Sequence, residues 1–215
     1  AKLTARARAV GAVLLDADEA AVTYRDGYVE VSGTNKRLSL FDLAAEAATR
    51  DLSLTTVAQA DAYNTYPNGC HLAEVEIDPE TGMTALVRYA AVDDSGVVLD
   101  PTLAVGQIVG GLAQGFGQAL MERVVYDGDG QLVSGSFMDY AMPRAADMPD
   151  LEIDFHVVPN PSNDLGVKGA GEGGSCGAPP AIVSAVCDAL GIAHIDMPLT
   201  PEAVWRAVRA QRAAA

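Results

Sequence analysis

One carboxylate in a run of glycines is the residue best suited to chemistry in this sequence. Glu172 stands between Gly169-Ala170-Gly171 and Gly173-Gly174, and glycine permits backbone conformations and close approaches that other residues exclude. Pro179-Pro180 follows, and proline is tolerated in the first turn of a helix. The sequence therefore predicts a bare loop followed by a helix over 178–190. A carboxylate in such a loop, shielded from water, can have a raised pKa and accept a proton as a general base.

Other roles compete for the same loop. Glu172 could simply satisfy amide groups at the start of the helix, and the residues alone favour this role. Residues 169–174 spell GxGxxG, but a dinucleotide fold needs this motif directly after a strand, and the next acid, Asp188, falls inside a helix. Ser175 or Cys176 near a helix N-terminus could be a nucleophile, as in a hydrolase, although no histidine lies nearby in the sequence.

The composition limits the possible partners and compartment. The 215 residues carry a net charge of −15 and are 49% hydrophobic, which argues against disorder and against a nucleic-acid partner. Three scattered cysteines without a CxxC motif exclude an iron–sulfur or zinc site built from this chain alone. No apolar run is long enough to cross a bilayer. We expect a cytoplasmic protein with reduced thiols, and a fragment or processed chain, since it begins at Ala1 in a helical pattern.

A glycine-rich helix and a hairpin are the elements expected to position the loop. Apolar and polar residues alternate over 70–77 and 83–89, on either side of an Asp-Pro-Glu-Thr-Gly turn, which predicts an antiparallel hairpin. Residues 102–126 predict a helix, although glycines inside it cost about 1 kcal/mol each relative to alanine. Either a closely packed backbone or a large ligand must offset that cost. Gln114, between Ala113 and Gly115, has an open amide that suits a phosphate or a pterin-like group.

The remaining pattern predicts an α+β fold with two lobes, in which helices pack on a mixed or antiparallel sheet. Helices are predicted over 1–17, over 39–50 with Ser39 as its N-cap, and over 200–210; a hairpin is predicted over 21–31 with its turn at Asp26-Gly27, and a strand over 151–158. We expect one lobe to comprise about 1–70 with 131–165, and the other 71–130 with 166–215.

Four segments, in order along the chain, resemble the xanthine dehydrogenase/aldehyde oxidase family. In particular they resemble the large, molybdopterin-binding subunit of bacterial three-subunit molybdenum hydroxylases, which include aerobic carbon monoxide dehydrogenases. The segments are YPNGCH (66–71), EVEIDPETG (74–82), GQIVGGLAQGFGQAL (106–120) and GVKGAGEGG (166–174) followed by PPAI (179–182). The resemblance covers essentially the whole chain, but only the C-terminal part of a subunit that is several times longer.

The resemblance implies a molybdenum-dependent oxidoreductase with the fold of the family's molybdopterin-binding domain. Glu172 is then the catalytic base in the hydroxylation of an aldehyde, purine or N-heterocycle, with water as the oxygen source. Gln114, with Gly115 beside it, contacts molybdopterin cytosine dinucleotide, and the glycine-rich helix lies against this cofactor. Lys168, Gly169 and Gly171 line the same pocket. The dithiolene of the pterin holds the metal, so no protein side chain is expected to be a metal ligand.

The resemblance also implies that this polypeptide is incomplete as an enzyme. The rest of the large subunit, an iron–sulfur subunit with 2Fe-2S clusters and an FAD subunit are the expected partners, in a dimer of heterotrimers. Two alternatives stay open: aerobic oxidation of carbon monoxide, and a cofactor-free assembly domain of such a complex.

Overall fold

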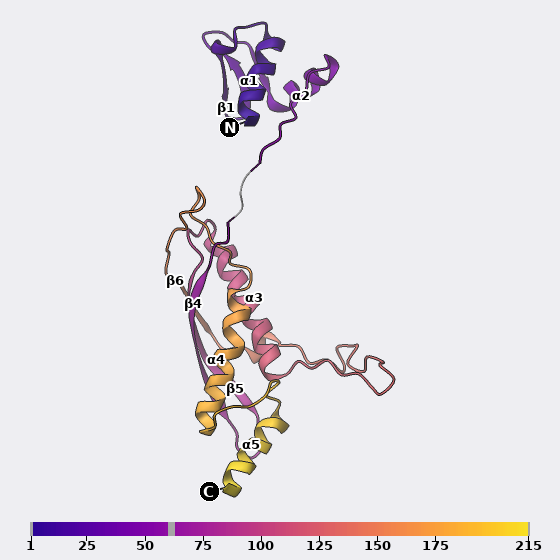
Figure 1. The fold of residues 1–215 in the computed structure, drawn as a ribbon, viewed down its shortest axis with the longest axis vertical. Helices are drawn as coiled ribbons and strands as arrows, with labels where there is room; N and C mark the ends of the chain where they lie inside the picture. The colour runs from indigo at the N-terminus through magenta and orange to yellow at the C-terminus, as the bar shows by residue number, and fades with distance from the viewer. Residues whose placement is uncertain (1, 60–62, 215) are drawn as a thin grey trace. The chain divides into compact units, whose positions relative to one another are not determined.

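Two units make up the structure, residues 1–62 and 63–215, and each has its own hydrophobic core (Figure 1). The computed structural model describes residues 2–59 and 63–214, so Ala1, at the start of the first predicted helix, and residues 60–62 and 215 lie outside the described residues. Both units combine helices with a small sheet, antiparallel in the first and mixed in the second. The predicted α+β class is confirmed.

The first unit is a three-stranded antiparallel sheet packed against two helices. Its elements are α1 (Lys2–Leu15), the 3-10 turn η1 (Glu19–Ala21), β1 (Val22–Arg25), β2 (Tyr28–Val31), β3 (Arg37–Ser39) and α2 (Leu40–Thr49). The predicted hairpin is confirmed: Arg25 pairs with Tyr28, and Asp26 and Gly27 close the turn with positive φ angles of 49° and 83°. Ser39 caps α2 by accepting a hydrogen bond from the amide of Asp42, as its sequence pattern predicts.

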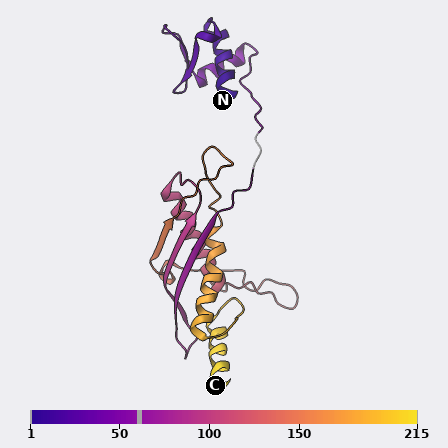
Figure 2. The ribbon, with the colours of Figure 1, turned by 60° about the vertical axis from the view of Figure 1, so that its left-hand side comes forward.

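The second unit is a long hairpin covered by two helices that lie side by side (Figures 1 and 2). Its elements are β4 (Asn68–Ile77), β5 (Thr84–Asp94), α3 (Pro101–Leu120), the 3-10 turn η2 (Ala145–Asp147), β6 (Leu151–Phe155), α4 (Gly173–Leu190) and α5 (Pro201–Ala214). The predicted hairpin of β4 and β5 is confirmed, and α4 packs against both β4 and α3. No helix within the described ranges is both long and apolar enough to span a bilayer.

The third strand of this sheet changes the predicted grouping of segments. β6 pairs with β5 in parallel, with Leu151 opposite Tyr89, so it belongs to the second unit, whereas the sequence pattern placed residues 131–165 with the first lobe. Parallel partners are joined by long crossovers, which local periodicity does not reveal.

Helices α3 and α4 of the second unit differ in their bounds from the predictions. α4 begins at Gly173, five residues before the predicted start at Ala178, because its first turn packs on the backbone of α3 and the Cys176 amide donates to the Glu172 carbonyl. Pro179 and Pro180 therefore stand inside the helix. α3 ends at Leu120 instead of 126, since Met121 leaves helical geometry and Tyr126 forms a β-bridge with Leu132.

Candidate functional site

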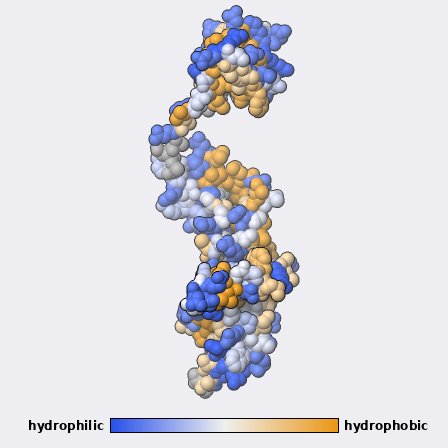
Figure 3. Space-filling view, turned by 90° about the vertical axis from the view of Figure 1, so that its right-hand side faces the viewer, coloured by the Kyte–Doolittle hydropathy of each residue, from blue (hydrophilic) through white to orange (hydrophobic). Residues whose placement is uncertain are grey.

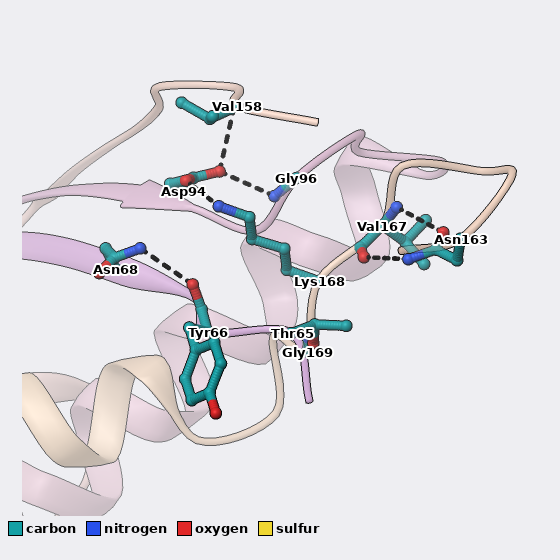
Figure 4. Close-up of polar contacts among 10 residues, drawn as sticks. All are labelled: Thr65, Tyr66, Asn68, Asp94, Gly96, Val158, Asn163, Val167, Lys168 and Gly169. Carbon is teal, nitrogen blue, oxygen red and sulfur yellow. Dashed lines mark hydrogen bonds and ion pairs between the residues drawn. The ribbon is translucent and has the colours of Figure 1, made fainter. Parts of the chain in front are cut away.

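The loop that leads to Glu172 is tied to the end of β5. Val167 forms an isolated antiparallel bridge with Gly96, and the Lys168 amide donates to the Ser95 carbonyl at 2.9 Å. The Asn163 side chain accepts from the Val167 amide at 3.1 Å and donates to its carbonyl at 2.9 Å (Figure 4). These bonds fix the backbone of the loop before it reaches the glycines.

Lys168 forms a buried ion pair at the base of the loop. Its ammonium donates to Asp94 at 2.5 Å, and each side chain is only 10% exposed (Figure 4). Asp94 also accepts from the amides of Gly96 at 2.9 Å and Val158 at 3.1 Å. The hydrogen bond from Lys168, supported by those amides, lowers the pKa of Asp94 to about 2. The charge of Lys168 is thus compensated within the protein, behind the loop.

Replacement of Lys168 by methionine is expected to destabilise the protein at neutral pH and to weaken the dependence of its stability on pH. The pKa of Asp94 is lower in the folded chain than its value of about 3.9 in an unfolded chain. Its stabilisation is therefore complete above the unfolded value and is lost as the pH falls toward 2. Without Lys168 the folded pKa of Asp94 rises toward or above the unfolded value, so urea unfolding should show a loss of stability at pH 6 that shrinks as the pH falls to 2. An unchanged pH dependence would contradict this account.

Two hydrogen bonds from distant segments hold the glycines themselves. The Gly169 amide donates to the hydroxyl of Thr65 at 3.0 Å (Figure 4), and the Gly171 carbonyl accepts from the amide group of Gln107 on α3 at 3.0 Å. Both glycines are exposed. Gln107 is a positioning residue that the sequence did not single out for this contact, although its place on the open side of the predicted helix was a signal.

Glu172 is an exposed carboxylate directly before the first residue of α4. Although it occupies the N-cap position, its side chain makes no capping hydrogen bond within the described residues. The hydroxyl of Ser175 instead donates to the Glu172 carbonyl, at 3.1 Å. The residues alone favoured a capping role for the Glu172 side chain, but the side chain does not cap the helix. The carboxylate is therefore free of that contact and open to another molecule.

Glu172 lies on the wall of a cavity of about 580 Å³ in the second unit. The lining consists of polar groups, glycines and a few apolar side chains, with no lysine or arginine among its described residues: Pro67, Asn68, Gly69, His71, Asp93, Ser95, Ile108, Gly169, Ala170, Gly171, Glu172, Gly173, Cys176 and Gly177. Of the predicted site residues, Glu172, Gly169 and Gly171 share this cavity. Lys168, Gln114 and Gly115 lie outside its lining.

Gln114 and Gly115 point to different sides of α3. Gly115 is buried, and a Cβ there would lie 2.7 Å from the Cβ of Ala178 and 2.9 Å from Pro179 of α4. Gln114 is exposed. Gly111 likewise packs on α4, whereas a Cβ at Gly106 or Gly110 would meet no described atom within 4 Å apart from their own stretch of helix backbone, and these glycines leave an open strip. Helix packing therefore accounts for the glycines that face α4, but not for the glycines of the open strip.

The two alternative chemistries find little geometric support. His71 and Cys176 line the same cavity, but the ring nitrogens of His71 face Tyr89 at 2.9 Å and Asp93 at 3.3 Å. The ring is therefore committed, and an activated nucleophile needs a free base. For the nucleotide motif, the preceding strand ends at Phe155, so no strand leads into the GxGxxG segment.

Comparison with known proteins supplies the family. A family model described as a molybdopterin cofactor-binding domain matches residues 1–149. The carbon monoxide dehydrogenase large chain of Hydrogenophaga pseudoflava is 34% identical over 97% of this chain, and the nicotine 6-hydroxylase large subunit of Paenarthrobacter nicotinovorans is 37% identical over 94%. The chain spans 27% and 26% of these two relatives.

Solved structures agree with the sequence matches. The quinoline 2-oxidoreductase of Pseudomonas putida 86 superposes with a TM-score of 0.72 at 34% identity, and covers 96% of this chain and 28% of its own. A Cu,Mo-CO dehydrogenase gives the same TM-score at 31% identity, with 98% and 28% coverage. Because the family model matches more than half of the sequence and these relatives match nearly all of it, the chain belongs to the molybdopterin cofactor-binding domain family of molybdenum oxidoreductases.

Proposed function

We propose that this chain is part of a molybdenum hydroxylase, in which it binds molybdopterin cytosine dinucleotide and supplies Glu172 as the catalytic base. The substrate class is a small organic molecule, an aldehyde, purine or N-heterocycle, that is hydroxylated with oxygen from water. The observation that carries the proposal is the exposed, uncapped carboxylate of Glu172 on the wall of a cavity, on a loop held by Lys168 and Gln107.

The open side of α3 fits a large planar cofactor. Gly106 and Gly110 leave room for a close approach, and the exposed amides of Gln107 and Gln114 lie on the same side of the helix. Leu103, which is 72% exposed, extends this surface at the start of the helix. Figure 3 shows that hydrophobic residues also form patches on the surface of the second unit. Amide groups both donate and accept hydrogen bonds, as the edges of a pterin and a phosphate require. We assign the cofactor contact to Gln114 and the exposed peptide groups of Gly169 and Gly171, with Gly115 allowing the close helix packing beneath.

In this proposal the residues of this chain accept the proton and hold the catalytic carboxylate in place. The bound cofactor supplies the oxidising power and the activated oxygen. Glu172 would accept a proton on its carboxylate, which requires that the carboxylate lie within hydrogen-bond reach of the group that gives up the proton. Thr65 binds the Gly169 amide and Gln107 binds the Gly171 carbonyl. These two hydrogen bonds fix the loop backbone before Glu172, so the direction in which the carboxylate faces the substrate is fixed.

Partner subunits follow from the same proposal. Relatives bear names such as "large chain", "large subunit" and "complex subunit gamma", which indicates assemblies of several subunits. Among the residues that the structure describes, no three His, Cys, Asp or Glu side chains gather as a metal site. We therefore place 2Fe-2S clusters and FAD on partner subunits, in a cytoplasmic dimer of heterotrimers with the rest of the large subunit. Relatives of similar identity include both carbon monoxide and nicotine enzymes, so carbon monoxide oxidation stays an alternative.

Cofactor analysis of the purified complex tests this proposal. Molybdenum is expected together with cytidine monophosphate released by acid hydrolysis, in equal amounts per copy of this chain. A complex that oxidises its substrate without molybdenum would overturn the proposal. An inactive complex without molybdenum, purified from cells that load a related enzyme normally, would instead identify a cofactor-free assembly domain.

A further inference from the structure

A buried chain of three polar side chains lies beneath the first turns of α4. His71 on β4 stands between Tyr89 and Asp93 on β5, with Nδ1 2.9 Å from the Tyr89 hydroxyl and Nε2 3.3 Å from Asp93. The side chains of His71 and Asp93 are 6% and 8% exposed, and Tyr89 is 1% exposed. Burial at this level is unusual for an aspartate and demands compensation.

The partners assign a direction to this chain of hydrogen bonds. A carboxylate only accepts, so Nε2–H of His71 donates to Asp93, and in the neutral imidazole Nδ1 then accepts from the hydroxyl of Tyr89. Burial and the negative charge of Asp93 raise the pKa of Tyr89, which keeps this hydroxyl protonated as the donor. All of the hydrogen-bonding groups of the imidazole ring are thereby used, and its orientation is fixed.

Three glycines show how closely this chain of side chains supports the catalytic turn. A Cβ at Gly177 of α4 would overlap the ring of His71, and a Cβ at Gly69 would overlap the carboxylate of Asp93. A Cβ at Gly173, the first residue of α4, would lie 3.7 Å from the same carboxylate. The helix backbone therefore rests on the imidazole and the carboxylate, immediately after Glu172.

The second carboxylate oxygen of Asp93 indicates an electrostatic role for this side chain beside the start of α4. Its Oδ2 is buried and has no hydrogen-bond partner among the described residues. The positive end of α4 lies beside this carboxylate, so the helix N-terminus and the imidazole share the compensation of one buried negative charge. A neutral side chain of the same shape would lose this attraction to the helix end.

We propose that Tyr89, His71 and Asp93 form a positioning unit that seats the first turn of α4 and thereby sets the place of Glu172. This inference rests on the proposed function of Glu172 for its catalytic consequence, but not for its structural one. None of the three acts as the base itself. Their effect on the reaction passes through the backbone of residues 173–177.

Hydrogen–deuterium exchange of the complete complex tests the unit without reference to activity. In Asp93→Asn, the first hydrogen-bonded amides of α4, over residues 176–178 and 181–183 (Pro179 and Pro180 have no N–H), are expected to exchange about tenfold faster, while α5 keeps its wild-type rates. With substrate, kcat is expected to fall about tenfold or more and KM to change little, because the base is displaced and binding is not. Asp196→Asn is the matched control, since Asp196 pairs with His194 at 2.9 Å in an exposed copy of the same contact.

The outcomes separate this proposal from the proposed function. Unchanged exchange over residues 176–183 in Asp93→Asn, or an equal rise in α5, would overturn the positioning unit. If that variant does not assemble, Tyr89→Phe keeps the buried ring and removes only the hydroxyl, and it must raise exchange in the same segment for the unit to stand. A Glu172→Gln complex that stays active would overturn the role of Glu172 alone, because it leaves the exchange result unaffected.

Discussion

Replacement of Glu172 by glutamine is expected to reduce turnover by about 10²–10⁴-fold while molybdenum content stays near that of the wild type. Glutamine has nearly the same shape but cannot take up a proton at neutral pH. The Glu172 side chain is exposed and makes no capping bond in the described part of the chain, so its replacement removes neither packing nor a helix cap. The loss should therefore appear in kcat and kcat/KM together, as expected for a group that acts in the transition state.

The controls for this variant concern charge and placement. Glu76→Gln, on the exposed side of β4, changes the net charge equally and should leave turnover unchanged. Glu172→Asp keeps a base but withdraws it by one methylene, so its activity should lie between the wild type and Glu172→Gln. Loss of molybdenum in Glu172→Gln would show instead that the carboxylate has a structural role in cofactor loading, and would remove the basis for calling it the base.

Local signals in the sequence were sufficient for much of the fold. The Asp26-Gly27 turn and the Ser39 cap each depend on residues within a few positions of one another, and both form as predicted. The start of α4 was not accessible in this way. Proline chemistry favoured a start at Pro179, but the packing of Gly174 on the backbone of α3 extends the helix back to Gly173. A contact between segments about 60 residues apart outweighed the local preference.

The residues of the candidate site also fall into two groups, those that local sequence patterns predicted and those that only tertiary contacts bring together. The glycine run made Glu172 visible, and its exposure on the cavity wall was foreseeable from the bare loop. Asp94, which pairs with Lys168, and Asp93, which faces His71, gave no signal, because each partner is more than 20 positions away in the chain. Register between β4 and β5 brings His71 to Asp93, and the bridge of the loop to the end of β5 brings Lys168 to Asp94. Local periodicity specifies neither contact. The predicted cofactor contacts of Lys168 and Gly115 stay predictions, with both residues engaged inside the protein.

Alanine substitutions at the adjacent glycines Gly110 and Gly111 of α3 are expected to change the stability of the protein in opposite directions. Alanine at Gly111 would place a Cβ 2.9 Å from the Ser175 amide nitrogen and 3.1 Å from the Cα of Gly174, and these backbone atoms cannot rotate away. We expect Gly111→Ala to destabilise the protein by about 1–3 kcal/mol through overpacking. Gly110 has no described neighbour within 4 Å of the same position, so Gly110→Ala should gain about 1 kcal/mol of helix stability.

Urea unfolding and molybdenum analysis of the same two variants distinguish the two faces of α3. If the open strip holds the cofactor, Gly110→Ala raises the unfolding midpoint of the cofactor-free protein but lowers the molybdenum content of the complex. Gly111→Ala lowers the midpoint and also displaces α4 at Ser175, three residues after Glu172, so turnover per molybdenum should fall. A Gly110→Ala complex that is more stable and fully loaded would mean that the cofactor does not lie on this strip. Packing against α4 would then fully explain Gly111 and Gly115, and Gly106 and Gly110 would face a partner other than the cofactor.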